Sequence, residues 1–162
     1  MEDIRGERAM MPLQPDYIWV LRARAALAGI VPVVVLAGLE QGLPPELGIP
    51  RGLISGVAVL LALLALFLLP RRRWRAWGYR EEEDELHVRH GLLIRYRTVV
   101  PFGRVQHIDI ARGPLERYFG LSTLVLHTAG THNASILLPG LGEHDAVAMR
   151  EVIREKIAAA AR

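Results

Sequence analysis

The sequence predicts an α+β membrane protein, in which a hairpin of two transmembrane helices precedes a small domain with a strongly bent β-sheet or partly open barrel capped by a C-terminal α-helix. Three observations support this fold class. Two long apolar runs lie within residues 17–69. From about Trp77 the hydrophobic pattern alternates with period two, which is typical of strands. In residues 143–161 apolar side chains recur every three or four positions, as in an amphipathic helix.

The composition excludes several classes of chemistry. The chain has 162 residues, and 51% of them are apolar, which is high for a soluble domain of this size. It has no cysteine, so a disulfide framework, a thiolate nucleophile and a cysteine-based metal site are all excluded. The net charge of +3 is too small and too unevenly distributed for a general nucleic-acid binder. We therefore expect the lipid bilayer as a partner, and no nucleic acid.

Two segments have the length and composition of membrane-spanning helices. The first covers residues 17–39, with Arg22 and Arg24 near its start, where long side chains can reach the headgroups. Pro32 lies in its middle, where we expect a kink that does not prevent insertion. The second covers residues 53–70 and carries no charged side chain. A buried core helix is the alternative for such runs. Cleavage as a signal peptide is disfavoured by the long charged lead and the missing A-x-A site.

The charge distribution predicts how these helices are oriented. Arginines lie before the first helix and after the second, whereas the connecting loop 40–52 contains only Arg51. The positive-inside rule therefore places the N-terminal segment 1–16 and the domain 71–162 in the cytoplasm, with the loop outside it. Aromatic side chains that favour the headgroup layer lie near the cytoplasmic ends; they are Tyr17, Trp19, Trp74 and Trp77.

A polybasic cluster directly follows the second apolar run. It consists of Arg71, Arg72, Arg73 and Arg75. A second transmembrane helix that ends in the cytoplasm needs such a flank to fix its topology, and we take that as the main role of the cluster. The same charges would also attract anionic lipids, by roughly 1 kcal/mol for each basic residue near the membrane surface. The four arginines are thus candidate lipid-headgroup contacts.

The alternating region predicts a series of short strands. Residues 86–90 and 92–100 form a first β-hairpin, with Gly91 in its turn and Pro101 at its end. The elements expected after it are a strand at 105–110, a helical turn at 114–120, two strands at 121–128 and 134–138 joined by a polar turn at 129–133, and the closing helix at 143–161. Val105 is out of phase with the rest of its strand, which indicates a bulge or a strand edge.

Two segments of this domain resemble a known family. Residues 100–108, VPFGRVQHI, and residues 114–130, PLERYFGLSTLVLHTAG, look like the bacterial pleckstrin-homology-like (PH-like) domain of YdbS-type membrane proteins. The preceding pair of hydrophobic segments follows that family's usual order. The resemblance implies a PH-like fold, with two roughly orthogonal sheets, six or seven strands and a C-terminal helix. It also implies a multi-pass protein of the bacterial cytoplasmic (inner) membrane, for which the charge distribution predicts that both termini are cytoplasmic. One or two short strands remain to be assigned, and residues 77–80 are the favoured place for one of them.

Four residues of the shared motif have a structural interpretation. Pro101 can turn the chain between strands, and Gln106 can hydrogen-bond across a sheet edge. Arg117 can pair with a carboxylate or a backbone carbonyl, and Gly120 can adopt the positive φ that ends a short helical turn. We expect these four residues to specify the fold, with a binding surface as the alternative.

The sequence contains no recognisable catalytic or metal-binding pattern. The motifs G-x-S-x-G, P-loop and H-E-x-x-H are absent. His87 and His90 are three apart in a predicted strand, so their side chains should point to opposite faces and not share a metal ion. The remaining histidines are interpreted as surface or turn residues; they are His107, His127, His132 and His144. The acidic run 81–85 is interpreted as a solvated loop. We expect no enzyme activity, no cofactor and no metal.

Two classes of function remain open. In the first, the PH-like domain binds a protein partner or assembles with itself at the membrane, for instance as an accessory subunit of a transporter or cell-envelope system. In the second, it senses anionic lipids. The second class would use Arg95 and Arg97, which we expect to project from one face of a strand, together with the polybasic cluster. The alternative interpretation is that Arg95 and Arg97 only form part of a solvated face of the sheet.

Overall fold

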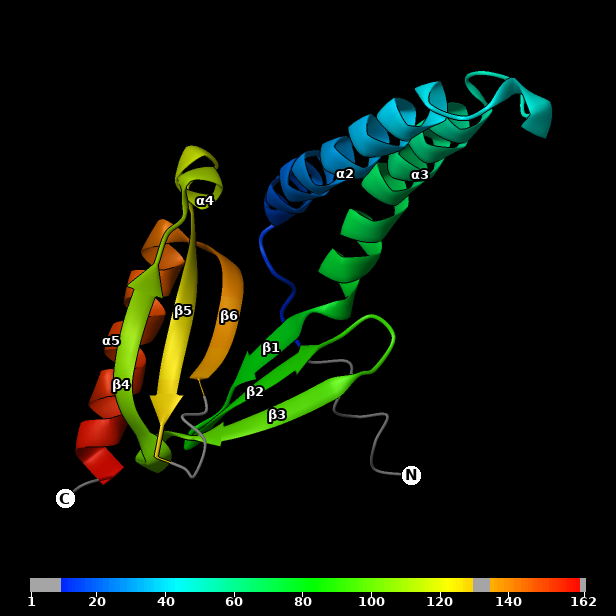
Figure 1. The fold of residues 1–162 in the computed structure, drawn as a ribbon. Coiled ribbons are helices and arrows are strands. Elements are labelled where there is room, and N and C mark those ends of the chain that lie inside the picture. The colour runs from blue at the N-terminus through cyan, green and yellow to red at the C-terminus, as the bar shows by residue number, and fades with distance from the viewer. Residues whose placement is uncertain (1–9, 130–134, 161–162) are drawn as a thin grey trace. The chain divides into compact units, whose positions relative to one another are not determined.

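The computed structural model describes residues 10–129 and 135–160, which fall into two compact units (Figure 1). The first unit combines the residues up to Tyr17 with those from Arg73 onward, and the second comprises Ile18–Arg72. The turn expected at 129–133 and the residue His132 lie at or within the undescribed stretch 130–134.

Two apolar helices, α2 (Tyr17–Gln41) and α3 (Leu53–Ala76), account for most of the helical unit. They lie side by side, and a Cβ atom at Gly29 would be 3.5 Å from that of Ala62. Both are long and apolar enough to cross a membrane, and in the most apolar 18 residues of each, 11% and 6% of the residues are buried. The core helix of a soluble protein would be mostly buried, so the exposure of these apolar side chains favours a lipid environment.

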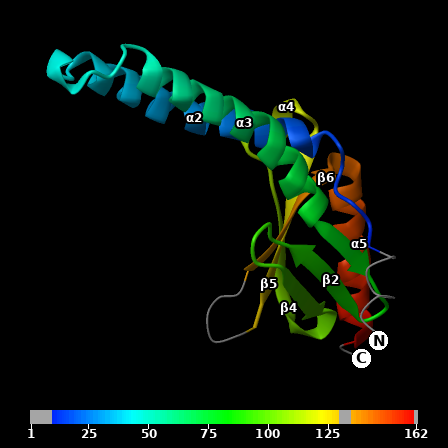
Figure 2. The ribbon, with the colours of Figure 1, turned by 90° about the vertical axis from the view of Figure 1, so that its right-hand side faces the viewer.

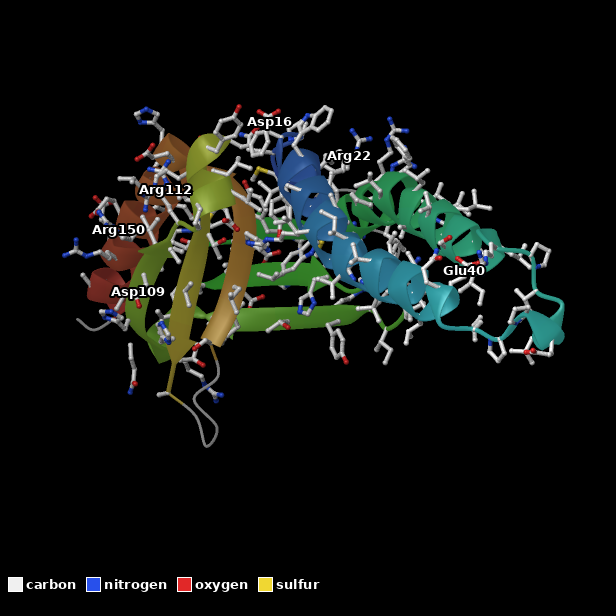
Figure 3. The ribbon with its side chains drawn as sticks, turned by 45° about the horizontal axis from the view of Figure 1, so that its top comes forward. Asp16, Arg22, Glu40, Asp109, Arg112 and Arg150 are labelled. Atoms are coloured by element: carbon white, nitrogen blue, oxygen red, sulfur yellow. The ribbon has the colours of Figure 1, made fainter. Side chains whose placement is uncertain are left out.

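The loop between the helices, which contains the short 3₁₀-helix η1 (Pro45–Leu47), is held by Glu40 (Figure 3). This carboxylate is 4% exposed and accepts hydrogen bonds from three backbone N–H groups at the start of α3: Gly52 (2.8 Å), Ile54 (3.0 Å) and Ser55 (3.1 Å). The first N–H groups of a helix have no partner within it, and an anion also interacts favourably with that end of the helix dipole. Glu40 therefore joins the two helices at their loop end.

Both helices differ from their expected bounds at one end. The second was expected to end at Pro70, but α3 continues through this residue to Ala76. Its last turns therefore carry the whole polybasic cluster, whose four side chains are exposed. Similarly, α2 continues two residues beyond the expected 39. Helix bounds set by hydropathy mark where the hydrocarbon ends, whereas the hydrogen-bonded helix can extend into the headgroup layer.

The β domain contains two antiparallel three-stranded sheets (Figure 1). Sheet A has the order β1-β2-β3, with β1 at Gly78–Glu81, β2 at Glu85–His90 and β3 at Tyr96–Pro101. Sheet B has the order β4-β5-β6, with β4 at Val105–Ala111, β5 at Leu121–Thr128 and β6 at Ser135–Gly142. The short 3₁₀-helix η2 (Phe102–Arg104) connects them. The strand expected within 77–80 is β1, and the described strands do not close into a barrel.

The C-terminal helix α5 (Glu143–Ala160) packs on sheet B and on η2 (Figures 1 and 2). Its buried face presents Ala146, Met149 and Ile153, which are at most 9% exposed. The elements that it packs against contribute buried side chains of their own, which include Phe102, Leu124, Leu126 and Leu138. This is the amphipathic helix that the three- and four-residue spacing predicts. The fold is therefore α+β and PH-like, as expected.

Local features of the sequence account for the shape of sheet B. The register between β4 and β5 shifts between Val105 and His107, at the position where the out-of-phase valine indicates a bulge. The short helix α4 (Pro114–Tyr118) begins with a proline and is followed by Gly120, whose φ of 66° is the left-handed conformation expected there. Proline at a first helical position and glycine after the end favour a single turn that stops cleanly.

Residues 10–16 belong to the same compact unit as the β domain, although the sequence predicts segment 1–16 as a separate part. Met11 and Tyr79 of β1 exchange backbone hydrogen bonds of 2.7 and 3.0 Å. The N–H of Gln14 donates to the carbonyl of Gly140 on β6, at 2.9 Å. Leu13 is 1% exposed, and the indole N–H of Trp74 donates to its carbonyl at 3.1 Å. Met11 therefore covers the outer edge of β1 at Tyr79, and Gln14 links the same segment to β6.

Candidate interaction surfaces

A groove of about 500 Å³ lies between the edge strand β4 and the helix α5. Its walls are formed by Val105, Gln106, His107 and Ile108 on β4 and by Arg150, Arg154, Ile157 and Ala158 on α5. Strand β4 pairs with β5 on one side only, and within residues 10–129 and 135–160 no strand covers its other side. Edge strands carry backbone N–H and C=O groups that can pair with an additional strand. We call this site the β4–α5 groove.

The groove follows from the local sequence. The bulge near the start of β4 leaves Gln106 and His107 exposed, while Val105 stays buried. On α5, the groove residues are spaced by four, three and one positions, so they form one stripe beside the core-facing residues. A bulge commonly redirects side chains at a sheet edge. Gln106, which the sequence assigns a structural role, therefore lies in this groove.

The helical wall of the β4–α5 groove is basic. Arg150 donates two hydrogen bonds to one oxygen of Glu151, at 3.0 and 2.7 Å, and Arg154 donates to the other oxygen at 3.2 Å. The hydrogen bond from Arg150 is the main reason why the pKa of Glu151 is lowered from its usual range. Two guanidinium groups thus share one carboxylate, and this wall has a net positive charge. Figure 3 labels Arg150 on α5.

Polar side chains join the three strands of sheet B on its exposed face. Asp109 accepts from His107 (2.8 Å) and lies 3.2 Å from the ring nitrogen of His127, whose other ring nitrogen is 2.8 Å from the hydroxyl of Ser135. The sequence suggested scattered histidines, but the structure brings His107 and His127 together, with ring centroids 5.8 Å apart. Asp109 and His127 keep 51% and 34% of their side chains exposed, so the arrangement is typical of cross-strand pairing.

The acidic run 81–85 is largely engaged with cations. Lys156 donates to Glu81 at 2.9 Å and to the carbonyl of Glu82 at 2.6 Å, while Arg80 forms an ion pair with the Glu82 carboxylate. Glu82, Glu85 and His87 bring three ligand-type atoms within 4.8 Å of one another, which is the closest approach to a metal site in the described residues. The guanidinium of Arg80 occupies the same carboxylate and would compete with a cation for it.

The basic residues predicted to bind lipid do not all lie on regular strands. Strand β3 begins at Tyr96, so Arg95 lies in the loop before it, and the shared strand face expected for Arg95 and Arg97 does not exist. The physical reason is Gly91, whose φ of 107° starts a loop that extends as far as Arg95. On β3, Arg97 lies directly opposite Arg89 of β2. Sequence reasoning missed this cross-strand pair, because it depends on the register.

The other motif residues have separate positions. Pro101 is the last residue of β3 and leads into η2, so it lies at the passage from sheet A to sheet B. Arg117 is exposed on α4, and its backbone N–H donates to the carbonyl of Gly113 at 2.9 Å. Gln106 is thus the one member of the motif that lines the β4–α5 groove.

Two apolar helices followed by a PH-like domain define a membrane-anchored PH-like protein. The family model described as "Bacterial PH domain" matches residues 26–157. The chain belongs to this family.

Two relatives from Bacillus subtilis (strain 168) are similar over part of their length. The chain is 31% identical to the UPF0699 transmembrane protein YdbS over 102 residues, which is 63% of this chain and 62% of that protein. It is 27% identical to the UPF0699 transmembrane protein YdbT over 102 residues, or 61% of this chain and 21% of that protein. The chain therefore spans less than two thirds of each. No solved structure matches.

Proposed function

We propose that this chain is a non-enzymatic protein of the bacterial cytoplasmic membrane whose PH-like domain binds an extended segment of a partner protein in the β4–α5 groove. The observation that carries the proposal is an uncovered edge strand beside a basic helical wall. An accessory role in a transporter or cell-envelope system is one form of this function. Assembly with a second copy of the chain is an alternative that the experiment below distinguishes.

The chemistry of the groove favours an extended, acidic partner segment. Backbone groups on the outer side of β4 can pair with an added strand, which supplies affinity that does not depend on sequence. Arg150 and Arg154 supply charge-assisted hydrogen bonds to carboxylates, and the apolar Val105, Ile108 and Ile157 supply contacts for alternate side chains. Specificity would therefore come from the spacing of acidic and apolar residues in the partner.

The topology part of the proposal rests on the N-terminal segment. Residues 10–14 precede α2, whereas β1 and β6, to which they hydrogen-bond, follow α3. If both helices cross the membrane, these bonds require the two flanks to lie on the same side. The arginine-rich flanks favour the cytoplasm as that side. A periplasmic-only reporter that is active when fused to the C-terminus would overturn the assignment.

Site-specific photo-crosslinking in native membranes tests the groove. A photoreactive amino acid at the exposed Gln106 should give a defined adduct with a partner, and Arg150→Ala with Arg154→Ala should abolish it. Arg117→Ala, which removes an exposed arginine outside the groove, should leave the adduct unchanged. The same probe at Tyr118, 82% exposed on α4, sets the background.

Three results would count against the proposed partner. An adduct at Gln106 no stronger than that at Tyr118 would show that nothing occupies the groove. An adduct between differently tagged copies of the chain would show that the groove binds a second copy and not a different protein. An adduct that survives loss of both arginines would contradict the role assigned to charge.

Lipid sensing is a second candidate, favoured by the exposed polybasic cluster on the last turns of α3. In this function Arg71, Arg72, Arg73, Arg75, Arg95 and Arg97 would contact anionic headgroups. Contacts of this kind are screened within about 10 Å at 0.1 M salt, so the affinity for anionic vesicles should fall steeply as salt increases. Binding that is insensitive to salt would exclude it.

A further inference from the structure

The loop between β2 and β3 exposes three consecutive apolar side chains. Leu92, Leu93 and Ile94 are 39%, 96% and 65% exposed. Soluble surfaces tolerate scattered apolar residues, but a contiguous apolar group at the tip of a hairpin indicates an interaction surface. We call these three residues the apolar tip.

The backbone holds the apolar tip outward. Gly91 has a φ of 107°, and a Cβ atom there would lie 1.9 Å from the carbonyl oxygen of Ile94, so the loop closes tightly on a position that requires glycine. At the base of the loop the ring of His90 stacks between Trp77 and Tyr96, with centroids 4.9 and 5.2 Å away. The exposed side chains therefore project from a fixed base.

The strand register puts the apolar tip at the end of sheet A where the chain leaves α3. Gly78 lies opposite Arg89, so the start of β1 is next to the end of β2 (Figure 1). Two residue steps separate Gly78 from Ala76, the last residue of α3, which limits the distance between their Cα atoms to about 7 Å. The base of the hairpin loop is thus tethered close to the end of this helix.

The length of α3 relates this end of the sheet to the bilayer. The apolar run stops at Pro70, and the remaining turns, from Arg71 to Ala76, advance about 8 Å along the helix axis. This is about the thickness of the headgroup layer on one side of a bilayer. The chain therefore enters sheet A near the outer limit of the headgroups, within reach of the apolar tip.

The charges around the apolar tip match an anionic membrane surface. Arg89, Arg95 and Arg97 flank it, with Arg89 and Arg97 side by side on neighbouring strands. No acidic residue occurs in the sequence between Glu85 and Asp109. An apolar end surrounded by cations is suited to the boundary between phosphates and acyl chains.

We propose that the apolar tip inserts into the surface of the bilayer that anchors this chain, with Arg89, Arg95 and Arg97 at the headgroups. Insertion gives the domain a second attachment besides α3 and so fixes the face that it turns to the membrane. The inference concerns sheet A and is independent of the β4–α5 groove on sheet B.

The absence of cysteine allows a direct test on the full chain. Single cysteines replacing Leu93 or, as a control, Tyr118 are labelled with an environment-sensitive fluorophore after reconstitution into vesicles of phosphatidylcholine with phosphatidylglycerol. The label at position 93 should be quenched several-fold more strongly by lipids with a nitroxide on the acyl chain than the label at 118. High salt should leave most of this difference in place, because contact with acyl chains is not screened.

A second variant separates insertion from simple proximity. Ile94→Asp, placed in the Leu93→Cys background, should abolish the acyl-chain quenching, because a charge at the tip opposes insertion, while Val99→Asp, an exposed site on the same hairpin, should not.

Three results would overturn the proposal. Equal quenching at positions 93 and 118 would show that the apolar tip makes no contact with the acyl chains. Quenching at position 93 that high salt removes would show that the contact is only electrostatic. Quenching that depends on protein concentration and appears with nitroxide on a second copy of the chain would make the tip a contact between copies. None of these results would affect the crosslinking expected at Gln106.

Discussion

The two sheets differ at one edge strand each, because β1 of sheet A is covered and β4 of sheet B is open. In sheet A the edge strand β1 exchanges backbone hydrogen bonds with Met11, so the N-terminal segment covers it. In sheet B the edge strand β4 borders a groove, and no described strand covers it. Proteins usually protect exposed edges because they invite unwanted pairing. The open edge of β4, beside two arginines, is the basis of the partner site proposed above.

The largest effect should come from disturbing the packing of Tyr17 against Gly140, which lies on β6 of sheet B and accepts the hydrogen bond from Gln14. The φ of Gly140 is 67°, and a Cβ atom there would lie 2.6 Å from Cγ of Tyr17, which is buried. Gly140→Ala should lower the free energy of unfolding of the β domain by about 3 kcal/mol, from backbone strain and the clash together. Denaturant titration of the purified chain in detergent, followed by tryptophan fluorescence, measures this.

Gly103→Ala is the matched control for that measurement. A Cβ atom at Gly103 would have nothing within 4 Å, and its φ is not positive. The denaturant midpoint of Gly103→Ala should stay close to that of the wild type. Equal midpoints for Gly140→Ala and Gly103→Ala would mean that the N-terminal segment does not pack on the domain as described.

A smaller effect is expected from Trp74→Phe. This change removes the indole N–H that donates to the carbonyls of Leu13 and Gln14, at 3.1 and 3.2 Å. The loss should cost about 1 kcal/mol and should speed hydrogen exchange at the amide of Met11, which bonds to Tyr79. Trp19→Phe, in the helical unit, serves as the control. Unchanged hydrogen exchange at Met11 would show that Trp74 does not stabilise the pairing of this residue with β1.

Tyr79 makes the covered edge sensitive to alkaline pH. Burial, aided by Asp145 and Glu81, raises the pKa of Tyr79 above its ordinary value of 10.0. A raised pKa gives stability that is complete below the unfolded-state pKa and is lost as the pH rises through the folded-state pKa. The wild type should therefore lose stability above about pH 10 faster than Tyr79→Phe, as measured by urea titration at several pH values. Parallel pH profiles would contradict a buried hydroxyl at this edge.

The smallest effect concerns the open edge. Arg150 lowers the pKa of Glu151, so this carboxylate stabilises the fold above the unfolded-state pKa, and that contribution is lost as the pH falls through the folded-state pKa. Because Glu151 is exposed, Glu151→Gln should reduce stability slightly at neutral pH, and the difference should vanish in acid. The same variant should strengthen the Gln106 adduct, since both arginines become available to the partner. A weaker adduct would indicate that Glu151 itself contacts the partner.

The sequence predicted most of what depends on local patterns. Apolar runs located α2 and α3, alternation located the first hairpin, and the phase of Val105 indicated the bulge in β4. Gly120 ends α4 in the expected conformation because proline and glycine act through the backbone of their own turn. The bounds of the membrane helices were less accurate, since hydropathy senses lipid contact and not hydrogen bonding.

The missed features depend on contacts between distant parts of the chain. Residues 10–14 show no hydrophobic periodicity, and their bonds to β1 and β6 are made by the backbone, so the sequence did not indicate that Met11 covers β1. The β4–α5 groove joins residues more than 40 positions apart, and only packing brings Gln106 next to Arg150. Arg95 was misplaced because Gly91 begins a longer loop than a two-residue turn would.

Hydrogen–deuterium exchange on the full chain in lipid nanodiscs tests the contrast between the two edges most directly. We expect slow exchange at Tyr79, whose N–H bonds to Met11 at 3.0 Å, and fast exchange at those amides of β4 that do not bond to β5. Amides of β4 that are as protected as Tyr79 in the purified chain would contradict an open edge, and with it the proposed site for a partner.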